Sequence, residues 1–200
     1  IYQCDWSSDV CSSDLETLAD GRCFGSIRLD RVTVASSQCI AAGTAALAAF
    51  ESATQCAAMI AGAELAGVMT RALDIMLDYL TTRVQFGKPI GSFQALQHRA
   101  VDLYIQSQFA VAVLEEALLA HEQNSNAAAR ASLASRVKAR CSDAALRIAR
   151  ESIQMHGAMG FTDECDVGLY VKRAMVLAAW LGNATHHRRR YARITFGAQS

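Results

Sequence analysis

The sequence predicts an all-α fold, an antiparallel four-helix up-down bundle, preceded by a short β segment. From residue 43 onward the chain is rich in alanine, and its long stretches repeat apolar residues every three or four positions. This is the period of a helix with one buried face. Only a few polar or glycine-containing residues separate these stretches. Such short connections favour antiparallel neighbours.

Residues 1–15, IYQCDWSSDVCSSDL, show neither a helical nor a strand period, and the triplet SSD occurs twice. Residues 4–15 can be back-translated into a string that resembles a common DNA-sequencing adapter. We therefore expect residues 1–15 to be non-native and leave them out of the fold prediction. A genuine N-terminal tail is the alternative. If the segment is non-native, we expect that the natural chain continued upstream.

Residues 25–34 are expected to form short strands. Their apolar positions suggest two short strands, at Ile27, Leu29, Val32 and Val34, with a break at residues 30–31. Two short strands do not form a stable sheet alone, so something else must cover them.

The bundle is expected over residues 43–200, with its first helix over about 45–82. Its buried stripe is formed by residues three or four positions apart, namely Gly62, Ala66, Met69, Leu73, Met76 and Leu80. Two glycines and the one proline of the chain then predict a turn over residues 86–91.

The second helix is expected from near Ser92 to a polar loop at 123–126. Its buried stripe consists of Leu96, Ala100, Leu103, Ala110, Leu114 and Ala117. The third helix is expected over 128–155, where glycines at 157 and 160 end it. Its stripe consists of Leu133, Val137, Cys141, Ala144, Ile148, Ser152 and Met155. A fourth helical region is expected over 166–180, with a break at 181–183 and a closing helix over 184–194.

The composition disfavours several classes of function. Nineteen basic and 19 acidic residues balance, so no strong field attracts nucleic acid or an anionic membrane. No uninterrupted apolar run approaches the ~20 residues of a spanning helix, and we expect no membrane span. Seven cysteines, an odd number without a C-x-x-C pair, indicate free thiols in a reducing cytosol. No metal site is expected, because the adjacent His186 and His187 point in different directions on a helix.

Four stretches carry a resemblance. They are RVQFGKPI at 83–90, FQALQ at 93–97, QMHGAMGF at 154–161 and KRA at 172–174. In this order and spacing they resemble the acyl-CoA dehydrogenase C-terminal domain over about residues 43–195. One R-x-x-F-G would be a weak signal, but four motifs in register are specific. Residues 16–42 look like the last strands of the family's middle β-domain.

The resemblance implies a flavin, FAD, bound at a subunit interface. It places Arg83 and Phe86 against the adenine and pyrophosphate portion of a cofactor held mainly by the neighbouring subunit, with Gln85 between them. A guanidinium pairs bidentately with pyrophosphate, and a phenyl ring packs on adenine. It also implies cofactor contacts for Gln154 and Gly157, although Ala158 replaces a second glycine of the family. The alternatives are a helix-terminal cation for Arg83 and a loop-to-core anchor for Phe86.

The resemblance further implies that the parent protein dehydrogenates an acyl-CoA thioester at its α and β carbons. A carboxylate takes the α-proton, and the flavin takes the β-hydride. Most family members carry the base at the position of Leu181, and a few carry a glutamate at the position of Ala57. Neither residue accepts a proton, so both expected positions of the base are empty.

Three explanations remain open. The chain is the subunit without a base in a heteromeric dehydrogenase, or Glu64 or His186 acts as the base, or the branch carries out other flavin chemistry on a non-CoA substrate. A structural subunit that completes the flavin site of a catalytic partner is the competing class. Under each of these explanations we expect a homo- or hetero-oligomer, a dimer or tetramer, in the bacterial cytoplasm.

The basic run at residues 186–190 has two interpretations. It is suited to the phosphates of CoA or FAD, but a solvated helix end explains it more simply. No interleaved aromatic residues support nucleic-acid binding. Without the preceding domains, we expect the chain alone to be inactive.

Overall fold

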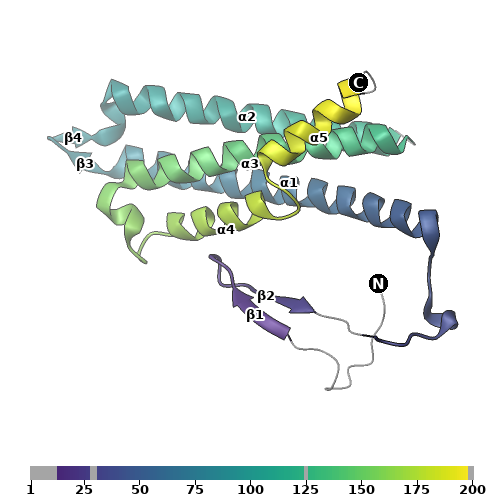
Figure 1. The fold of residues 1–200 in the computed structure, drawn as a ribbon. Helices are drawn as coiled ribbons and strands as arrows, with labels where there is room; N and C mark the ends of the chain where they lie inside the picture. The colour runs from purple at the N-terminus through teal and green to yellow at the C-terminus, as the bar shows by residue number, and fades with distance from the viewer. Residues whose placement is uncertain (1–12, 28–30, 124–125, 198–200) are drawn as a thin grey trace.

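The computed structural model describes residues 13–27, 31–123 and 126–197. In that part of the chain five α-helices form a bundle, with a β-hairpin beside it (Figure 1). The helices are α1 (Gly43–Thr82), α2 (Gln94–Gln123), α3 (Ala127–His156), α4 (Val167–Ala179) and α5 (Ala184–Phe196). The prediction of an all-α bundle is confirmed. The turn at 181–183 separates α4 from α5, as expected. The two helices together occupy the place of the fourth helix of the bundle.

Helix α3 is the centre of the bundle and packs against α1, α2, α4 and α5. The predicted stripes are buried except Leu96 and Leu133, which are half-buried. Small residues let the helices approach closely. A β-carbon added at Gly62 of α1 would lie 2.5 Å from Val137 Cγ1 of α3. This close approach of α1 and α3 fixes the relative position of their ends.

Short polar or glycine caps set the helix boundaries around the later sites. The side chain of Asn126 accepts hydrogen bonds from the backbone N–H groups of Ala128 and Ala129 at the start of α3. Asn183 does the same for His186 at the start of α5. Helix α3 ends at Gly157, whose φ of 61° is a conformation that glycine adopts at little cost.

The N-terminal β structure differs from the prediction. Strand β1 (Ser13–Thr17) pairs antiparallel with β2 (Cys23–Ile27). Of the strands expected over 25–34, only the end of β2 is present. Val32 and Val34 lie outside any strand, and residues 28–30 are not among those described. Part of the segment expected to be non-native therefore pairs as a strand, because an exposed hairpin needs an extended backbone rather than alternating apolar side chains.

One arginine links the hairpin to the bundle. Arg173 of α4 donates a 2.7 Å hydrogen bond from Nη1 to Asp20 Oδ2 in the hairpin loop. Its Nε donates a 2.6 Å bond to Glu64 Oε1 of α1. Residues from three segments that are distant in sequence thus share one guanidinium.

A second, very short hairpin follows α1, where the sequence predicts a turn. It consists of β3 (Val84–Gln85) and β4 (Lys88–Pro89). Phe86 and Gly87 between them have positive φ angles of 53° and 78°. Two consecutive positive φ angles match the twist of a tight hairpin. The hairpin projects from one end of the bundle (Figure 1).

By length and composition, two helical stretches of the described residues meet the criterion for a membrane span, contrary to the sequence expectation. They are Ser36–Thr82 and Gln94–His121. Core helices of bundles meet the same criterion, and 56% of the most apolar window of the first stretch is buried within the bundle. Only 28% of the corresponding window in α2 is buried, so more of this window is uncovered than in the first stretch.

Candidate cofactor and active site

The turn after α1 presents two side chains away from the bundle. Phe86 is 91% exposed, and its ring meets the Phe93 ring edge-on at 6.0 Å between centroids. Arg83, the residue that ends α1, is also exposed. The core-anchor interpretation of Phe86 is therefore wrong. The Phe86 ring, on a turn constrained by two positive φ angles, is therefore accessible to a ligand or a second chain.

Gln85 and Lys88 complete this turn. The side-chain amide of Gln85 donates a 2.8 Å hydrogen bond to the Val84 carbonyl, and Gln85 is exposed. The Lys88 ammonium lies 4.3 Å from the centroid of the Phe93 ring, within the range of a cation–π contact. The turn thus carries two cations and two aromatic rings, a combination suited to a ligand with phosphates and a planar base.

The loop after α3 lies at the same end of the bundle as this turn (Figure 1). The Tyr79 ring near the end of α1 stacks on the His156 ring at the end of α3, with 4.3 Å between centroids. His156 Nδ1 donates a 2.6 Å hydrogen bond to the Ser152 carbonyl. Gln154 in the last turn of α3 and Gly157 just after it are exposed. The structure therefore brings all five predicted cofactor residues to one end of the bundle.

The position of the missing base borders a pocket of about 230 Å³ between α1 and α5. Leu181 lines this pocket in a left-handed conformation with φ 58°. His186 lines it from α5, and Glu51 and Ala58 line it from α1. Ala57 is not among the lining residues, although its neighbour Ala58 is.

Glu51 is a carboxylate that the sequence analysis missed. It lies six residues before Ala57 on α1. Residues 51 and 58 are two helical turns apart and therefore lie on one face of α1, so the helical spacing could have identified Glu51. Glu64, in contrast, is ion-paired with Arg173 and does not line this pocket. The structure therefore places Glu51 and His186 beside Leu181, and leaves Glu64 in a structural contact.

Two buried basic side chains hold the Leu181 turn. The Nε2–H of His187 donates a 3.0 Å hydrogen bond to the Leu181 carbonyl. The Lys138 ammonium of α3 donates to the Gly182 carbonyl at 3.0 Å and to the Ala178 carbonyl at 3.1 Å. Burial lowers the pKa of His187 to about 4 and that of Lys138 to about 8. His187 is only 3% exposed, so the solvated-helix interpretation of the basic run is wrong for this residue.

The comparisons with known proteins fit this geometry. The profile of the family "Acyl-CoA dehydrogenase, C-terminal domain" matches residues 37–196. The chain belongs to the acyl-CoA dehydrogenase family. The chain is 40% identical over 134 residues to acyl-CoA dehydrogenase IpdE2 of Mycolicibacterium smegmatis. That alignment covers 67% of this chain and 40% of the relative.

Other relatives and solved structures agree. Acyl-CoA dehydrogenase IpdE2 of Mycobacterium tuberculosis is 44% identical over 118 residues, which cover 59% of this chain and 35% of that protein. A variant of the Tcur3481-Tcur3483 steroid ACAD superposes with a TM-score of 0.83 at 26% identity, over 96% of this chain and 50% of that one. The acyl-CoA dehydrogenase chain thus spans well under half the length of the curated relatives it matches.

The pKa of His187 predicts a pH dependence for the stability of this acyl-CoA dehydrogenase chain. The folded value, about 4, is below the ordinary 6.5, so the unfolded chain binds more protons between these values. Stability is complete above pH 6.5 and falls as the pH drops towards 4. The loss is roughly 1–2 kcal/mol after allowance for solvent screening. Urea unfolding at pH 7 and pH 4.5 measures it.

A matched pair of variants tests whether His187 causes this loss of stability at acid pH. His187→Gln keeps an N–H for the Leu181 carbonyl but does not titrate, so its stability should change less between the two pH values. His186→Gln, at the exposed neighbouring position, should behave as the wild type. An unchanged pH dependence in His187→Gln would assign the acid loss to another group.

Proposed function

We propose that this chain is the C-terminal bundle of an FAD-dependent acyl-CoA dehydrogenase and acts as the subunit without its own catalytic glutamate. The observation that carries the proposal is the exposure of Arg83 and Phe86 at the end of the bundle where Gln154 and Gly157 are also exposed (Figure 1). A helical bundle without a partner at this end has no evident use for a 91% exposed phenylalanine on a left-handed turn.

The residues at this end fit the adenine and pyrophosphate portion of FAD. The Arg83 guanidinium would pair with the pyrophosphate, since its planar fork matches two phosphate oxygens. The Phe86 ring would stack on the adenine, and Gln85 and Gln154 would provide neutral polar contacts. Gly157 leaves room for close backbone approach because it has no side chain. When bound, the flavin accepts the hydride that leaves the β carbon.

The Leu181 pocket supports the part of the proposal that concerns the base. Leu181 has no group that accepts a proton, and its turn is held by Lys138 and His187 through backbone carbonyls. The α-proton of the acyl-CoA would therefore be taken by a glutamate of a second dehydrogenase chain. Glu51 and His186 line the same pocket, as does the buried His187, and the experiment below includes the two exposed residues, Glu51 and His186.

An oligomer with another acyl-CoA dehydrogenase chain is supported by the apolar surface of α2. Exposed large side chains recur along one face of this helix, namely Val101, Tyr104, Ile105 and Phe109. Such a face is typical of a helix that packs against another chain. Two similar solved structures are named as complexes or pairs of chains, ChsE4-ChsE5 of Mycobacterium tuberculosis and Tcur3481-Tcur3483. The bacterial relatives agree with a cytoplasmic location.

Dye reduction with a panel of acyl-CoA thioesters tests the proposal. The full-length protein is produced alone and together with each acyl-CoA dehydrogenase chain encoded beside it. We expect FAD retention and turnover only in the co-produced complex. Loss of turnover on replacing the partner's glutamate with glutamine would identify the base. Turnover by the full-length protein alone would contradict the assignment of a subunit without a base.

Two variants separate the remaining explanations. Glu51→Gln and His186→Gln in this chain should leave turnover within about twofold if the partner provides the base. A loss of several orders of magnitude in either variant would move the base into this chain. A complex that retains FAD but oxidises none of the thioesters would favour flavin chemistry on a non-CoA substrate.

A further inference from the structure

Leu181 occupies a position in a tight turn that normally takes glycine. Trp180 has φ −62° and ψ 137°, Leu181 has φ 58°, and the Gly182 N–H donates a 3.2 Å hydrogen bond to the Ala179 carbonyl. These values fit a type II turn over residues 179–182, with Leu181 as its third residue. That position needs a positive φ and prefers glycine or asparagine, because a β-carbon is crowded there. The backbone at Leu181 is therefore strained.

A strained turn persists only where its surroundings fix it, and Lys138 of α3 does this from the buried side. Its ammonium donates to the carbonyls of Ala178 and Gly182, at 3.1 and 3.0 Å. These two carbonyls come before and after Leu181 in the chain. A third hydrogen bond, of 3.3 Å to Ser142 Oγ, ties the ammonium to its own helix. Lys138 is completely buried, so its three hydrogen bonds are protected from water.

His187 of α5 holds the middle of the turn. Its Nε2–H donates a 3.0 Å hydrogen bond to the Leu181 carbonyl. Within the described residues, its Nδ1 is buried and has no hydrogen-bond partner. The bond to the turn is therefore the one hydrogen bond of this buried ring, and it accounts for a polar residue at this place.

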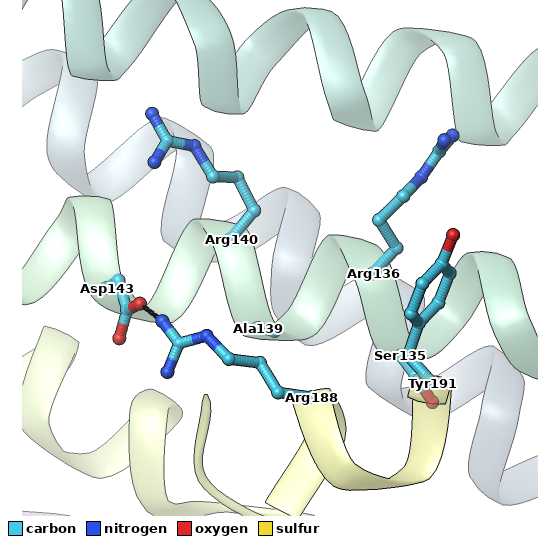
Figure 2. Close-up of a pocket in the computed structure, with 7 residues that line it drawn as sticks. All are labelled: Ser135, Arg136, Ala139, Arg140, Asp143, Arg188 and Tyr191. Atoms are coloured by element: carbon cyan, nitrogen blue, oxygen red, sulfur yellow. Dashed lines mark ion pairs between the residues drawn. The ribbon is translucent and has the colours of Figure 1, made fainter. Parts of the chain in front are cut away.

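Helix α5 is itself fixed to α3 directly after His187. Arg188 forms an ion pair with Asp143 of α3 (Figure 2). Arg190 donates a 3.0 Å hydrogen bond to Ser135 Oγ, also on α3. Because α3 carries the buried lysine as well, both groups that hold the turn are anchored to the central helix of the bundle.

We propose that Lys138 and His187 are positioning residues, which hold Leu181 in its left-handed conformation so that it forms a wall of the pocket between α1 and α5. Leu181 lines that pocket, and Glu51 and Ala58 line it from α1. A glycine would relieve the strain in the turn but would leave no side chain at this wall. The leucine therefore sets the size of the pocket. This positioning role does not depend on the proposed function, whereas a role in selecting the acyl group rests on it.

Hydrogen exchange of the full-length protein, followed by mass spectrometry on peptides that span residues 178–184, tests the positioning role. Lys138→Met should lower the protection factor of the Gly182 amide by roughly 10-fold or more, because the strained turn relaxes once two of its carbonyls lose their donor. Adding Leu181→Gly to Lys138→Met should restore most of this protection, since glycine adopts a positive φ without strain. A lysine that only stabilises the core predicts no such rescue.

His187 provides a second, milder pair of variants. His187→Leu keeps a buried side chain of similar size without the donor, and should lower the protection of the Gly182 amide by roughly threefold or more. His187→Gln keeps an N–H and should protect this amide as the wild type does. Lys172→Met, at an exposed position on α4, is the control and should change protection less than about twofold. Unchanged protection in His187→Leu, or no rescue of Lys138→Met by Leu181→Gly, would overturn the proposal.

Substrate selectivity of the assembled enzyme tests the wall. Leu181→Gly should raise kcat/KM for a bulky acyl-CoA relative to a short one by roughly 10-fold, the usual effect of a few methylene groups in a pocket. Lys138→Met should shift the ratio in the same direction, and Lys172→Met should not. An unchanged ratio in an active complex whose hydrogen exchange behaves as expected would overturn the role in selecting the acyl group, but not the positioning role.

Discussion

Replacing Lys138 with methionine should lower the free energy of unfolding by about 2–4 kcal/mol. Lys138 is completely buried, and its ammonium donates to Ser142 Oγ and to the carbonyls of Ala178 and Gly182. Methionine fills nearly the same volume but leaves two carbonyl oxygens at the end of α4 without this donor. Urea unfolding followed by circular dichroism measures the change. Lys172→Met, at an exposed position on α4, should change stability by less than about 0.5 kcal/mol.

The pKa of Lys138 gives this prediction a second readout. Burial lowers the folded value to about 8 from the ordinary 10.5, so the unfolded chain binds more protons between these values. Wild-type stability relative to Lys138→Met should therefore rise as the pH increases from 8 to 10.5. Equal stability of the variant at pH 7 would mean that the desolvation of the amine offsets all three hydrogen bonds. An unchanged pH profile would instead mean that burial does not lower the pKa of Lys138.

Replacing Arg83 with alanine should weaken FAD retention by the assembled full-length protein by roughly 10- to 100-fold, the usual contribution of a charge-assisted pair with phosphate. Arg83 is exposed at the end of α1, so its loss should not affect the bundle core. Flavin absorbance after gel filtration, followed by titration with FAD, measures the change. This expectation rests on the proposed function.

Arg71→Ala provides the control for Arg83→Ala. Arg71 is exposed on the same helix, about three turns earlier and away from the turn at its end. It removes the same charge and should retain FAD as the wild type does. Equal losses in both variants would indicate a general electrostatic effect. Full retention in Arg83→Ala would remove the pyrophosphate contact from the proposal.

The helices of this chain were predictable because their signals are local. The stripe from Gly62 to Leu80 repeats with the helical period, and the glycines at 87 and 157 mark turns that the structure confirms. The five expected cofactor residues could be named because they lie in short motifs. That they meet at one end of the bundle follows from two parallel helices, α1 and α3, ending at the same level.

The contacts around Leu181 could not be predicted, because they join residues that are distant in sequence. In the sequence, Lys138 resembles any other polar residue of an amphipathic helix. In the structure its ammonium donates a hydrogen bond to the Ala178 carbonyl near the end of α4. Glu64 reads as a free carboxylate, but Arg173 neutralises it. The strand prediction near Val32 failed because strand pairing depends on a partner, and the partner of β2 precedes it in the chain.

The stacked rings of Tyr79 and His156 join the last turn of α1 to the last turn of α3. The residues expected to contact the cofactor flank these two turns, after the end of α1 and at the end of α3. The stacked pair therefore couples the packing of the two segments, so removal of either ring should loosen both of them.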